Sequence, residues 1–373
     1  MAEPSRPVSV EEIEQLAIGA WILGAGGGGS PYHGLLNMRR LYAEGTVVRL
    51  LDPAALADED DVAVVSFMGA PLVTQERFKD PDALARAVRM MEAYIGRRFR
   101  AVMAVEIGGG NGLAPFMAAA RLDLPVVDAD AMGRAFPEAQ MTSFAIKGLR
   151  CFPLTLADVR DNAVIVARAA DWKWMERLSR KVCTEVGSTA ATCKAPRTGR
   201  EVKDAGILYT TTKAIRLGAL VQAARRAHQD PVEAILAAEG GRLLFRGKVQ
   251  DVARRTTEGF LRGAARLEGL DEYAGQRFDL AFQNEWAVGW HDGEPRVMTP
   301  DLICVMDALA GEAIGTETLR YGQRVSVVAL PAPDILLTPR GLEHVGPRAF
   351  GYDLDFRSVF ASPAATPGGS GAA

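Results

Sequence analysis

The stretch FRAVMAVEIGGGNG, residues 99–112, decides the fold of this chain. It is a short apolar run that reaches Glu106 and then enters a cluster of glycines. An apolar run bounded by turn residues is typical of a strand that is buried on both faces. The residues that follow, LAPFMAAARL at 113–122, have the composition of a helix. A buried strand followed by a helix is the repeating unit of an α/β fold.

The same alternation of strand and helix continues on both sides of this stretch. Helix signals include Ser30 and Pro31, which suit the N-cap and the first position of a helix. The predicted strands are residues 46–52, 61–71, 99–112 and 124–133, and the predicted helices are residues 10–23, 31–43, 80–96 and 113–122. The sequence therefore predicts an α/β domain over residues 1–165, with a helix-covered, mostly parallel sheet.

A different pattern follows, with more antiparallel character. Residues 152–169 resemble a hairpin, and helices are predicted at 171–186, at 206–228 and after Asp230-Pro231. Four β segments then follow, at residues 242–256, 277–293, 301–319 and 324–333. They favour an antiparallel sandwich or barrel. We expect a helical insertion and a β-rich domain over residues 166–358, and a disordered tail at 359–373.

Composition narrows the class of protein. Apolar residues make up 48% and charged residues 24%, as in ordinary globular proteins, and the net charge of −3 favours neither nucleic acid nor an anionic membrane as partner. The chain has no secretory signal and no apolar stretch of about 20 residues, so we expect a soluble, cytoplasmic protein. The four cysteines and four histidines lack metal-site spacing, although carboxylates could hold a divalent metal.

A second glycine-rich stretch, LGAGGGGSP at residues 23–31, raises the question of phosphate binding. Gly24, Gly26 and Gly29 match the GxGxxG spacing of dinucleotide-binding loops, but the preceding residues have helical periodicity and no Walker lysine follows. The alternatives are a site for a small anion or a polar carbonyl at a helix N-terminus, and a tight turn that requires glycine. We expect residues 26–29 (Gly26, Gly27, Gly28 and Gly29) to contact a ligand.

The ends of the predicted strands gather polar groups at one edge of the sheet, where α/β folds bind ligands. Asp128 and Asp130 are two residues apart, so on a strand they face the same side, and paired carboxylates suit acid–base catalysis. They could instead cap a helix or pair with Arg134. The candidate catalytic residues are Glu106, Asp128, Asp130 and Glu138. The candidate substrate-binding residues outside the glycine run are Met68, Gly69, Gly109, Asn111, Arg134 and Gln140.

Two further features leave alternatives open. Apolar strand sequence is interrupted by three polar residues, Gln283, Asn284 and Glu285. They could form a bulge, a domain contact or a substrate contact. Cys183 and Cys193 could act as nucleophiles, but no partner base is evident.

Nine separated motifs between residues 13 and 356 resemble one known family, that of S-methyl thiohydantoin desulfurase, formerly a family of unknown function. The motifs are GAGGGGSP, MGAP, EIGGGNGLAP, PVVDADAMGRAFPEAQM, FRGKVQDVARRTTEGF, FQNE, TPDLI, TETLRYGQRV and GPRAFGYD. The resemblance implies an α/β domain followed by a β-rich domain. It also implies hydrolysis of a five-membered S-methylated thiohydantoin ring to a hydantoin and methanethiol. One departure is a third glycine before Asn111, where relatives commonly have two.

This reaction needs a base for water, an acid for a ring nitrogen and donors for the ring carbonyl. We expect Glu106, Asp128 and Asp130 to supply the base and the acid, and Asn111, Arg134 and the glycine loops to bind the ring. A carboxylate-held divalent metal could activate the water instead. Some relatives are fused to, or encoded beside, hydantoinase or oxoprolinase proteins. The alternatives are therefore a non-catalytic subunit of such a complex and a nucleotide-binding enzyme, and a homo-oligomer is a further option.

Overall fold

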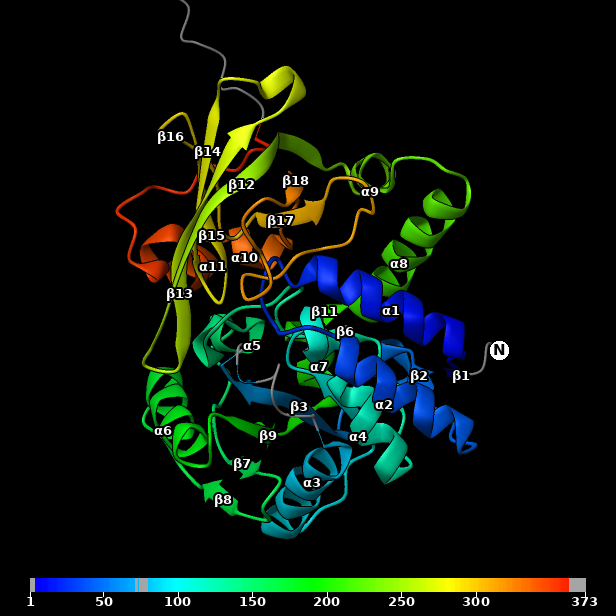
Figure 1. Ribbon diagram of the computed structural model, residues 1–373. Helices are drawn as coiled ribbons and strands as arrows, with labels where there is room; N and C mark the ends of the chain where they lie inside the picture. Colours follow the sequence, from blue (N-terminus) through cyan, green and yellow to red (C-terminus); the bar gives the residue numbers. More distant parts are fainter. Residues whose placement is uncertain (1–3, 71–72, 74–79, 362–373) are drawn as a thin grey trace, which may run out of the picture.

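The computed structural model describes residues 4–70, 73 and 80–361 (Figure 1). An α/β part occupies the lower half of this view and a β-rich part the upper half. The α/β class and the β-rich second half predicted from the sequence are confirmed. Within the described residues, no helix combines the length and the apolar character that crossing a membrane requires.

The lower part is built on one mixed sheet, sheet A, whose described strands have the order β1-β2-β5-β4-β3-β9-β7-β8, with β10 also paired to β3. The four central strands, from β2 to β3, pair in parallel, and antiparallel strands flank them. The bounds are β1 Ser5–Pro7, β2 Arg49–Leu51, β3 Asp61–Gly69, β4 Ala101–Ala104, β5 Val126–Val127, β7 Leu154–Ala157, β8 Ala163–Val166, β9 Thr189–Cys193 and β10 Arg197–Thr198.

The central strands of sheet A are buried on both faces, as their apolar sequence predicts. In β3, Ala63 and Val65 pack into the core on one face, while Val62 and Val64 pack into the core on the other. One core holds helices α1 (Val10–Leu23), α2 (Tyr32–Ala43), α3 (Pro81–Ile95), α4 (Ala114–Leu122), α8 (Thr210–Arg226) and α9 (Pro231–Glu239). The other holds α5 (Ser143–Ile146), α7 (Gly199–Ala205), α10 (Asp334–Leu337) and α11 (Pro339–Val345).

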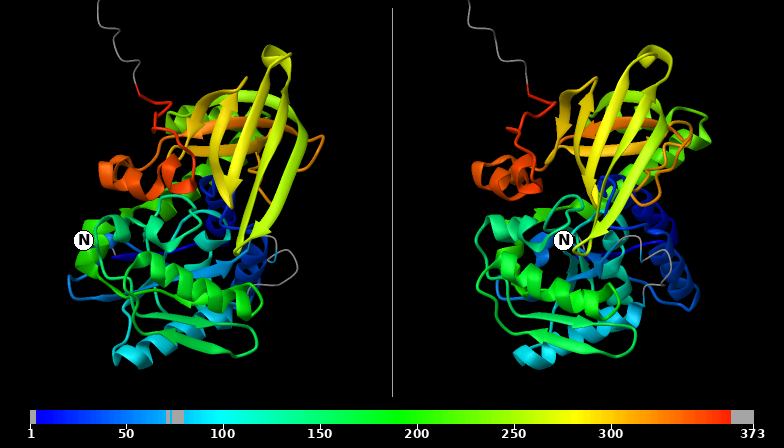
Figure 2. Two further views of the ribbon diagram at one scale, coloured as in Figure 1. Left: turned by 90° about the vertical axis from the view of Figure 1, so that its left-hand side faces the viewer. Right: turned by 60° about the vertical axis from the view of Figure 1, so that its left-hand side comes forward.

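The upper part is one antiparallel sheet, sheet C, in the order β16-β15-β14-β13-β12-β18-β17. It bends into half a barrel (Figure 2). The bounds are β12 Arg242–Thr257, β13 Phe260–Gly269, β14 Arg277–Gln283, β15 Glu285–His291, β16 Glu294–Met298, β17 Leu302–Asp307 and β18 Arg324–Leu330. The sequence predicted an antiparallel sandwich or barrel. The loop between α1 and α2 packs against this part of the chain: Trp286 N donates to Ala25 O (2.9 Å) and Thr316 N to Gly26 O (2.8 Å).

Some elements differ from those predicted. Residues 189–205 carried no prediction, yet they form β9, β10 and α7, and β9 and β10 complete sheet A from beyond residue 165. Residues 124–133 form β5 and a separate short strand, β6 (Ala129–Asp130), which pairs with β11 (Ile207–Leu208). Helix α6 (Trp172–Glu185) lies on the predicted helix 171–186. Of the predicted disordered tail, residues 362–373 lie outside the described residues.

Candidate functional site

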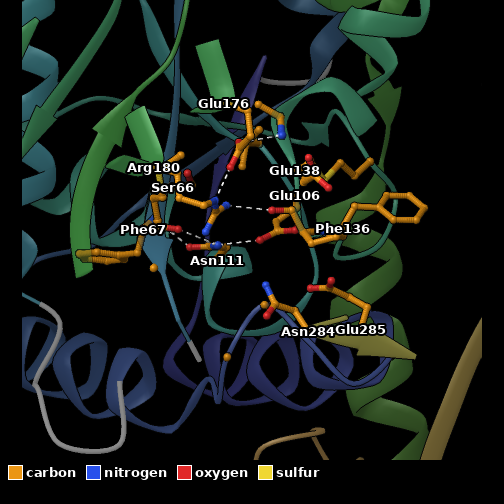
Figure 3. A pocket seen from close by; sticks show the side chains of 18 of the residues that line it. Ser66, Phe67, Glu106, Asn111, Phe136, Glu138, Glu176, Arg180, Asn284 and Glu285 are labelled. Atoms are coloured by element: carbon orange, nitrogen blue, oxygen red, sulfur yellow. Dashed lines mark hydrogen bonds and ion pairs between the residues drawn. The ribbon is translucent and has the colours of Figure 1, made fainter. Parts of the chain in front are cut away.

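A cavity of about 80 Å³ lies where the carboxyl ends of β3 and β4 face the turn between β14 and β15 (Figure 3). One water needs roughly 10–15 Å³ by this measure, so the cavity suits a small compact molecule. Residues from both sheets, from α6 and from the two glycine loops line it. They are Gly28, Gly29, Ser66, Phe67, Met68, Gly69, Val105, Glu106, Asn111, Met132, Phe136, Pro137, Glu138, Ala139, Glu176, Arg180, Thr189, Lys194, Asn284 and Glu285.

Glu106 is held in this cavity by donors on both carboxylate oxygens. Asn111 Nδ2 donates to Glu106 Oε1 (2.6 Å), and the backbone N–H of Phe136 donates to Oε2 (3.0 Å). Asn111 is itself fixed by the backbone of Phe67, which donates to its Oδ1 (2.9 Å) and accepts from its Nδ2 (3.1 Å). Both oxygens of Glu106 therefore accept from fixed N–H groups. Asn111 therefore orients Glu106, and its own donors are already used.

Glu285 enters the cavity from the opposite sheet in a different environment. It is 2% exposed, and its Oε2 has no hydrogen-bond partner among the described residues. Burial raises the pKa of Glu285 well above its ordinary value, the Glu106 carboxylate raises it further, and Arg134 opposes both. Two facing carboxyl groups whose surroundings differ in this way are suited to act as base and acid.

Arg134 lies behind this pair as a fully buried cation. Its Nη1 donates to the carbonyls of Pro300 (3.2 Å) and Asp301 (3.1 Å), and its guanidinium lies 4.6 Å from the ring centroid of Phe136. Burial lowers the pKa of Arg134 to about 10, so it remains charged at neutral pH. Arg134 does not line the cavity. Its positive charge nevertheless acts on Glu285 and lowers the pKa of that carboxyl group.

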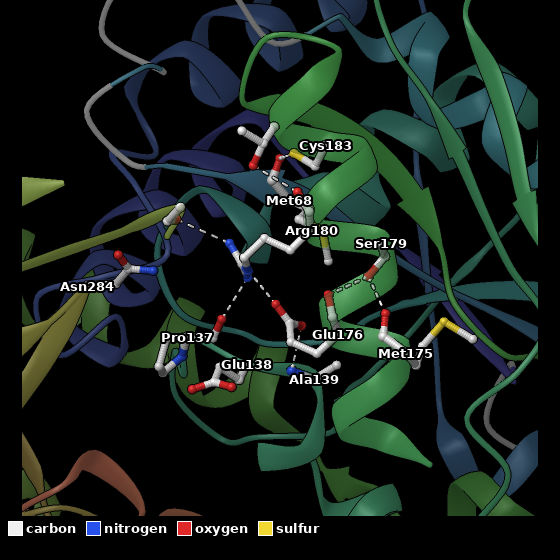
Figure 4. Close-up of polar contacts among 12 residues, drawn as sticks. Met68, Pro137, Glu138, Ala139, Met175, Glu176, Ser179, Arg180, Cys183 and Asn284 are labelled. Atoms are coloured by element: carbon white, nitrogen blue, oxygen red, sulfur yellow. Dashed lines mark hydrogen bonds and ion pairs between the residues drawn. The ribbon is translucent and has the colours of Figure 1, made fainter. Parts of the chain in front are cut away.

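Helix α6 supplies a second group of charges (Figure 4). Arg180 Nε donates to Glu176, and Glu176 Oε2 accepts from the backbone N–H of Ala139 (3.0 Å). Arg180 Nη2 donates to Pro137 O (2.9 Å), and its guanidinium lies 4.2 Å from the Phe260 ring centroid. The ion pair therefore joins α6 to the loop before η4 (Ala139–Met141) and to the tip of the β12–β13 hairpin.

Glu138, a predicted catalytic residue, lies at the edge of the cavity. Its carboxylate accepts from Gln140 Nε2 (2.6 Å) and from Gln283 Nε2 (3.2 Å). Gln140, predicted to bind substrate, does not line the cavity but lines a neighbouring hollow. The Glu138 carboxylate thus links sheet C to the cavity wall.

Part of the glycine run lines the cavity, and the rest packs against sheet C. Gly28 and Gly29 line the cavity, and their carbonyls accept from Gly110 N (3.1 and 2.7 Å). A Cβ on Gly27 would lie 2.0 Å from Glu285 Oε1, and one on Gly26 would lie 2.4 Å from Trp286 Nε1. Protein atoms therefore make the close approach that four consecutive glycines suggested. The element before the run is the helix α1, so the strand that a dinucleotide loop requires is absent.

The structure separates Asp128 and Asp130 from the cavity. Asp128 accepts from Thr212 N (3.0 Å) and from the Thr212 hydroxyl, so it caps α8. Asp130 Oδ2 accepts from the backbone N–H groups of Ile107 (2.8 Å), Met132 (3.2 Å) and Gly133 (2.8 Å) and thereby joins two loops. Burial raises the pKa of Asp130 to about 7. Their placement gives no support to the expected acid–base pair, because the two carboxylates bind protein backbone instead.

The remaining expectations divide in the same way. Met68 and Gly69 line the cavity, whereas a Cβ on Gly109 would lie 2.6 Å from the Gly28 carbonyl carbon, so Gly109 packs against the other glycine loop.

Burial raises the pKa of Cys183 to about 11 and that of Cys193 to about 12, which disfavours the nucleophilic thiolate. In the described part of the chain, no three His, Cys, Asp or Glu side chains converge as a metal site would require.

Sequence reasoning missed Glu176, Arg180 and Lys194, and it left Asn284 and Glu285 undecided. Lys194 follows the apolar run of β9, just as Glu106 follows that of β4, so the same criterion could have found it. Glu176 and Arg180 are spaced as an ordinary surface ion pair on a helix, and only tertiary packing distinguishes them.

Comparison with known proteins identifies a family that covers most of the chain. A family model described as S-Me-THD-like, N-terminal domain, matches residues 11–168, and one described as S-Me-THD-like, C-terminal domain, matches residues 170–359. The X-ray structure of a structural genomics target from Chromobacterium violaceum is similar in fold, with a TM-score of 0.77 and 24% identity over 93% of this chain and 98% of that one. No curated protein matches the chain. Since the two family models together span nearly all of residues 11–359, the chain belongs to the S-Me-THD-like family.

Proposed function

We propose that this protein is a hydrolase that converts an S-methylated thiohydantoin ring to a hydantoin and methanethiol. The observation that carries the proposal is the pair Glu106 and Glu285, two carboxyl groups in one small cavity with opposite surroundings. In this proposal Glu106, whose oxygens accept from two N–H groups, acts as the carboxylate, whereas burial favours the protonated form of Glu285. Membership of the S-Me-THD-like family supports the choice of substrate.

The first step is the addition of water to the ring carbon that carries the S-methyl group. Glu106 takes a proton from the water as its oxygen bonds to this carbon. The π electron pair of the C=N bond moves to the ring nitrogen, which takes the proton of Glu285. The product is a tetrahedral carbon that carries a hydroxyl and the S-methyl group, beside a ring N–H.

The second step breaks the C–S bond. The sulfur leaves with the bonding pair and takes the proton that Glu106 holds, which gives methanethiol. The hydroxyl gives its proton to Glu285 as the C=O bond forms. Both carboxyl groups are then back in their starting states, and one water has been consumed for each methanethiol released.

Asn284 is the residue that we expect to align the ring. Its Oδ1 accepts from Leu261 N (2.8 Å), which fixes the amide, and its Nδ2 has no hydrogen-bond partner within the described residues. The side chain is 5% exposed and directs Nδ2 into the cavity (Figure 3). Because the amide is fixed and Nδ2 faces the cavity, this donor is available to an acceptor atom of a bound ring.

The test is incubation of the protein with an S-methyl thiohydantoin, with methanethiol release as the readout and with a chelator in a parallel sample. We expect release with both samples. We expect Glu106→Gln and Glu285→Gln each to lower kcat about 10²- to 10⁴-fold, since each removes a proton-transfer group. The exposed Glu44 provides the control, and Glu44→Gln should leave turnover unchanged.

Three results would contradict parts of the proposal. Loss of turnover with the chelator would assign the activation of water to a metal. Near wild-type turnover in both Gln variants would exclude this acid–base pair. No turnover by the wild-type protein, together with co-purification with a hydantoinase-type protein, would favour the non-catalytic subunit.

A further inference from the structure

The proposed reaction needs one group that the carboxyl pair does not supply. When water adds to the ring carbon, negative charge moves onto the ring nitrogen and the carbonyl conjugated with it, and a fixed cation or donor would stabilise that charge. Asn111 has no donor left, and Arg134 does not reach the cavity. Arg180 donates from each of its three nitrogens to protein acceptors.

Among the described residues that line the cavity, Lys194 is the remaining cation. It follows β9, which pairs with β3, and its side chain is 8% exposed. Its ammonium has three N–H donors, but within the described residues Nζ makes a single hydrogen bond, to Thr192 Oγ1 at 3.4 Å. No carboxylate of those residues forms an ion pair with it.

The neighbours of Lys194 are arranged so that they do not use its remaining donors. Thr192 Oγ1 donates to Ser66 O (3.1 Å), and the Ser66 hydroxyl lies 3.0 Å from Thr192 Oγ1. Since the Thr192 proton goes to the Ser66 backbone carbonyl, the Ser66 hydroxyl is the donor to Thr192 Oγ1. Burial lowers the pKa of Lys194, while the carboxylates of Glu176 and Glu106 act in the opposite direction and favour the ammonium.

A buried ammonium with unused donors is costly for folding. Taking a charge out of water is unfavourable unless partners replace the water, and here one long hydrogen bond does so. The same position in front of a cavity is favourable for a bound molecule, because the donors are already oriented and the surroundings are dry. The geometry is that of a group whose partner is the ligand.

We propose that Lys194 is a catalytic residue that donates a hydrogen bond from its ammonium to the ring carbonyl oxygen, and so stabilises the charge that develops as water adds. This inference rests on the proposed function. Lys194 transfers no proton in this role, and the proton balance stays with Glu106 and Glu285.

The test compares Lys194→Met with the wild type and with Lys147→Met, which changes an exposed lysine outside the cavity. Turnover of an S-methyl thiohydantoin, binding of hydantoin by calorimetry and thermal unfolding are measured for all three. We expect Lys194→Met to lower kcat about 10²- to 10³-fold and to weaken hydantoin binding. Its Tm should be unchanged or higher, since an apolar side chain replaces an unpaired buried charge. Lys147→Met should behave as the wild type.

The outcomes distinguish this inference from the proposed function. Wild-type kcat and hydantoin affinity in Lys194→Met would overturn the role of Lys194 while leaving the hydrolase intact. No methanethiol from the wild type would overturn the hydrolase, and Lys194 would then be judged by hydantoin binding alone. Affinity lost in the variant would support it, and equal affinity, or no binding by the wild type, would contradict it.

A measurement on the wild type keeps the test decisive if the variant does not fold. Lys194 is acetylated with acetic anhydride at alkaline pH, with and without hydantoin, and the modified lysines are identified by mass spectrometry. We expect hydantoin to protect Lys194 and not Lys147. Equal acetylation of Lys194 in both samples, or none at all, would contradict its contact with the ring.

Discussion

At the scale of single residues, carboxyl groups in similar sequence surroundings have different roles because their hydrogen-bond partners differ. Glu106 binds an amide and a backbone N–H inside the cavity, Asp128 caps a helix and Asp130 ties two loops together. All of them follow apolar strands in the sequence. The partner groups come from distant parts of the chain. The sequence therefore shows which carboxylates are candidates, but not which of them lies in the cavity.

Asp130 gives a prediction about pH and stability. Its pKa is about 7 in the folded protein and about 4 in an unfolded chain, so between these values the folded state binds more protons. Stability from this group is therefore present at low pH and is lost as the pH rises through 7. We expect Asp130→Asn, which cannot ionise, to gain a few degrees in Tm relative to the wild type between pH 5 and pH 8.

Thermal unfolding across this pH range provides the measurement. Asp123 is exposed and serves as the control, because Asp123→Asn should show no such trend. A constant Tm difference between Asp130→Asn and the wild type would show that Asp130 is ionised throughout.

At the scale of elements, the loop between α1 and α2 is both a packing element and part of the cavity wall. Gly27 faces the Glu285 carboxyl, and Gly28 and Gly29 accept from the backbone of the other glycine loop. A Cβ on Gly26 or Gly27 would meet sheet C, and one on Gly28 would meet that second loop. The glycine run therefore allows two segments of the α/β part and one of sheet C to converge.

Gly27→Ala tests this arrangement. The added Cβ would lie 2.0 Å from Glu285 Oε1, so the carboxyl must move away from its position beside the cavity. We expect kcat to fall at least tenfold with a loss of stability of about 1–3 kcal/mol, measured by turnover and by denaturant unfolding. Gly34→Ala in α2 meets only the Leu113 side chain, at 3.1 Å, and should retain activity. Full activity in Gly27→Ala would mean that the position of Glu285 is unimportant.

At the scale of the whole molecule, the cavity exists only where the two parts meet. Sheet A and its loops supply Glu106 and Lys194, sheet C supplies Asn284 and Glu285, and α6 supplies Glu176 and Arg180. The long β12–β13 hairpin of sheet C reaches α6, where Arg180 contacts its tip (Figure 1). This contact holds sheet C over the cavity.

Arg180→Lys should loosen that contact. A lysine keeps the charge near Glu176 but cannot also bond to Pro137 and Gly259 or stack in the same way on Phe260. We expect faster hydrogen exchange at the hairpin tip and a lower Tm, while exchange in β4 stays unchanged. Arg40→Lys on the exposed face of α2 is the matched control. Unchanged exchange at the tip would show that Arg180 does not fasten the hairpin.

The sequence by itself determined the α/β class, most of the strands and helices of the first part, and the β-rich second part. These follow from local apolar patterns and from turn and capping residues, which act over a few positions along the chain. It also made Glu106 a candidate and drew attention to residues 283–285 without assigning them a role, because polar and ionisable groups stand out in apolar strands.

Only the tertiary structure decided the composition of the site. Lys194 and Arg180 reach the cavity, and Asp128, Asp130 and Arg134 do not, because of contacts between segments that are far apart in the sequence, 166 residues in the case of Arg134 and Pro300. The same applies to the glycine run, whose neighbours are Glu285 and Trp286. Local patterns record which residues are buried, whereas the contacts that give a buried charge its role form only when distant segments pack together.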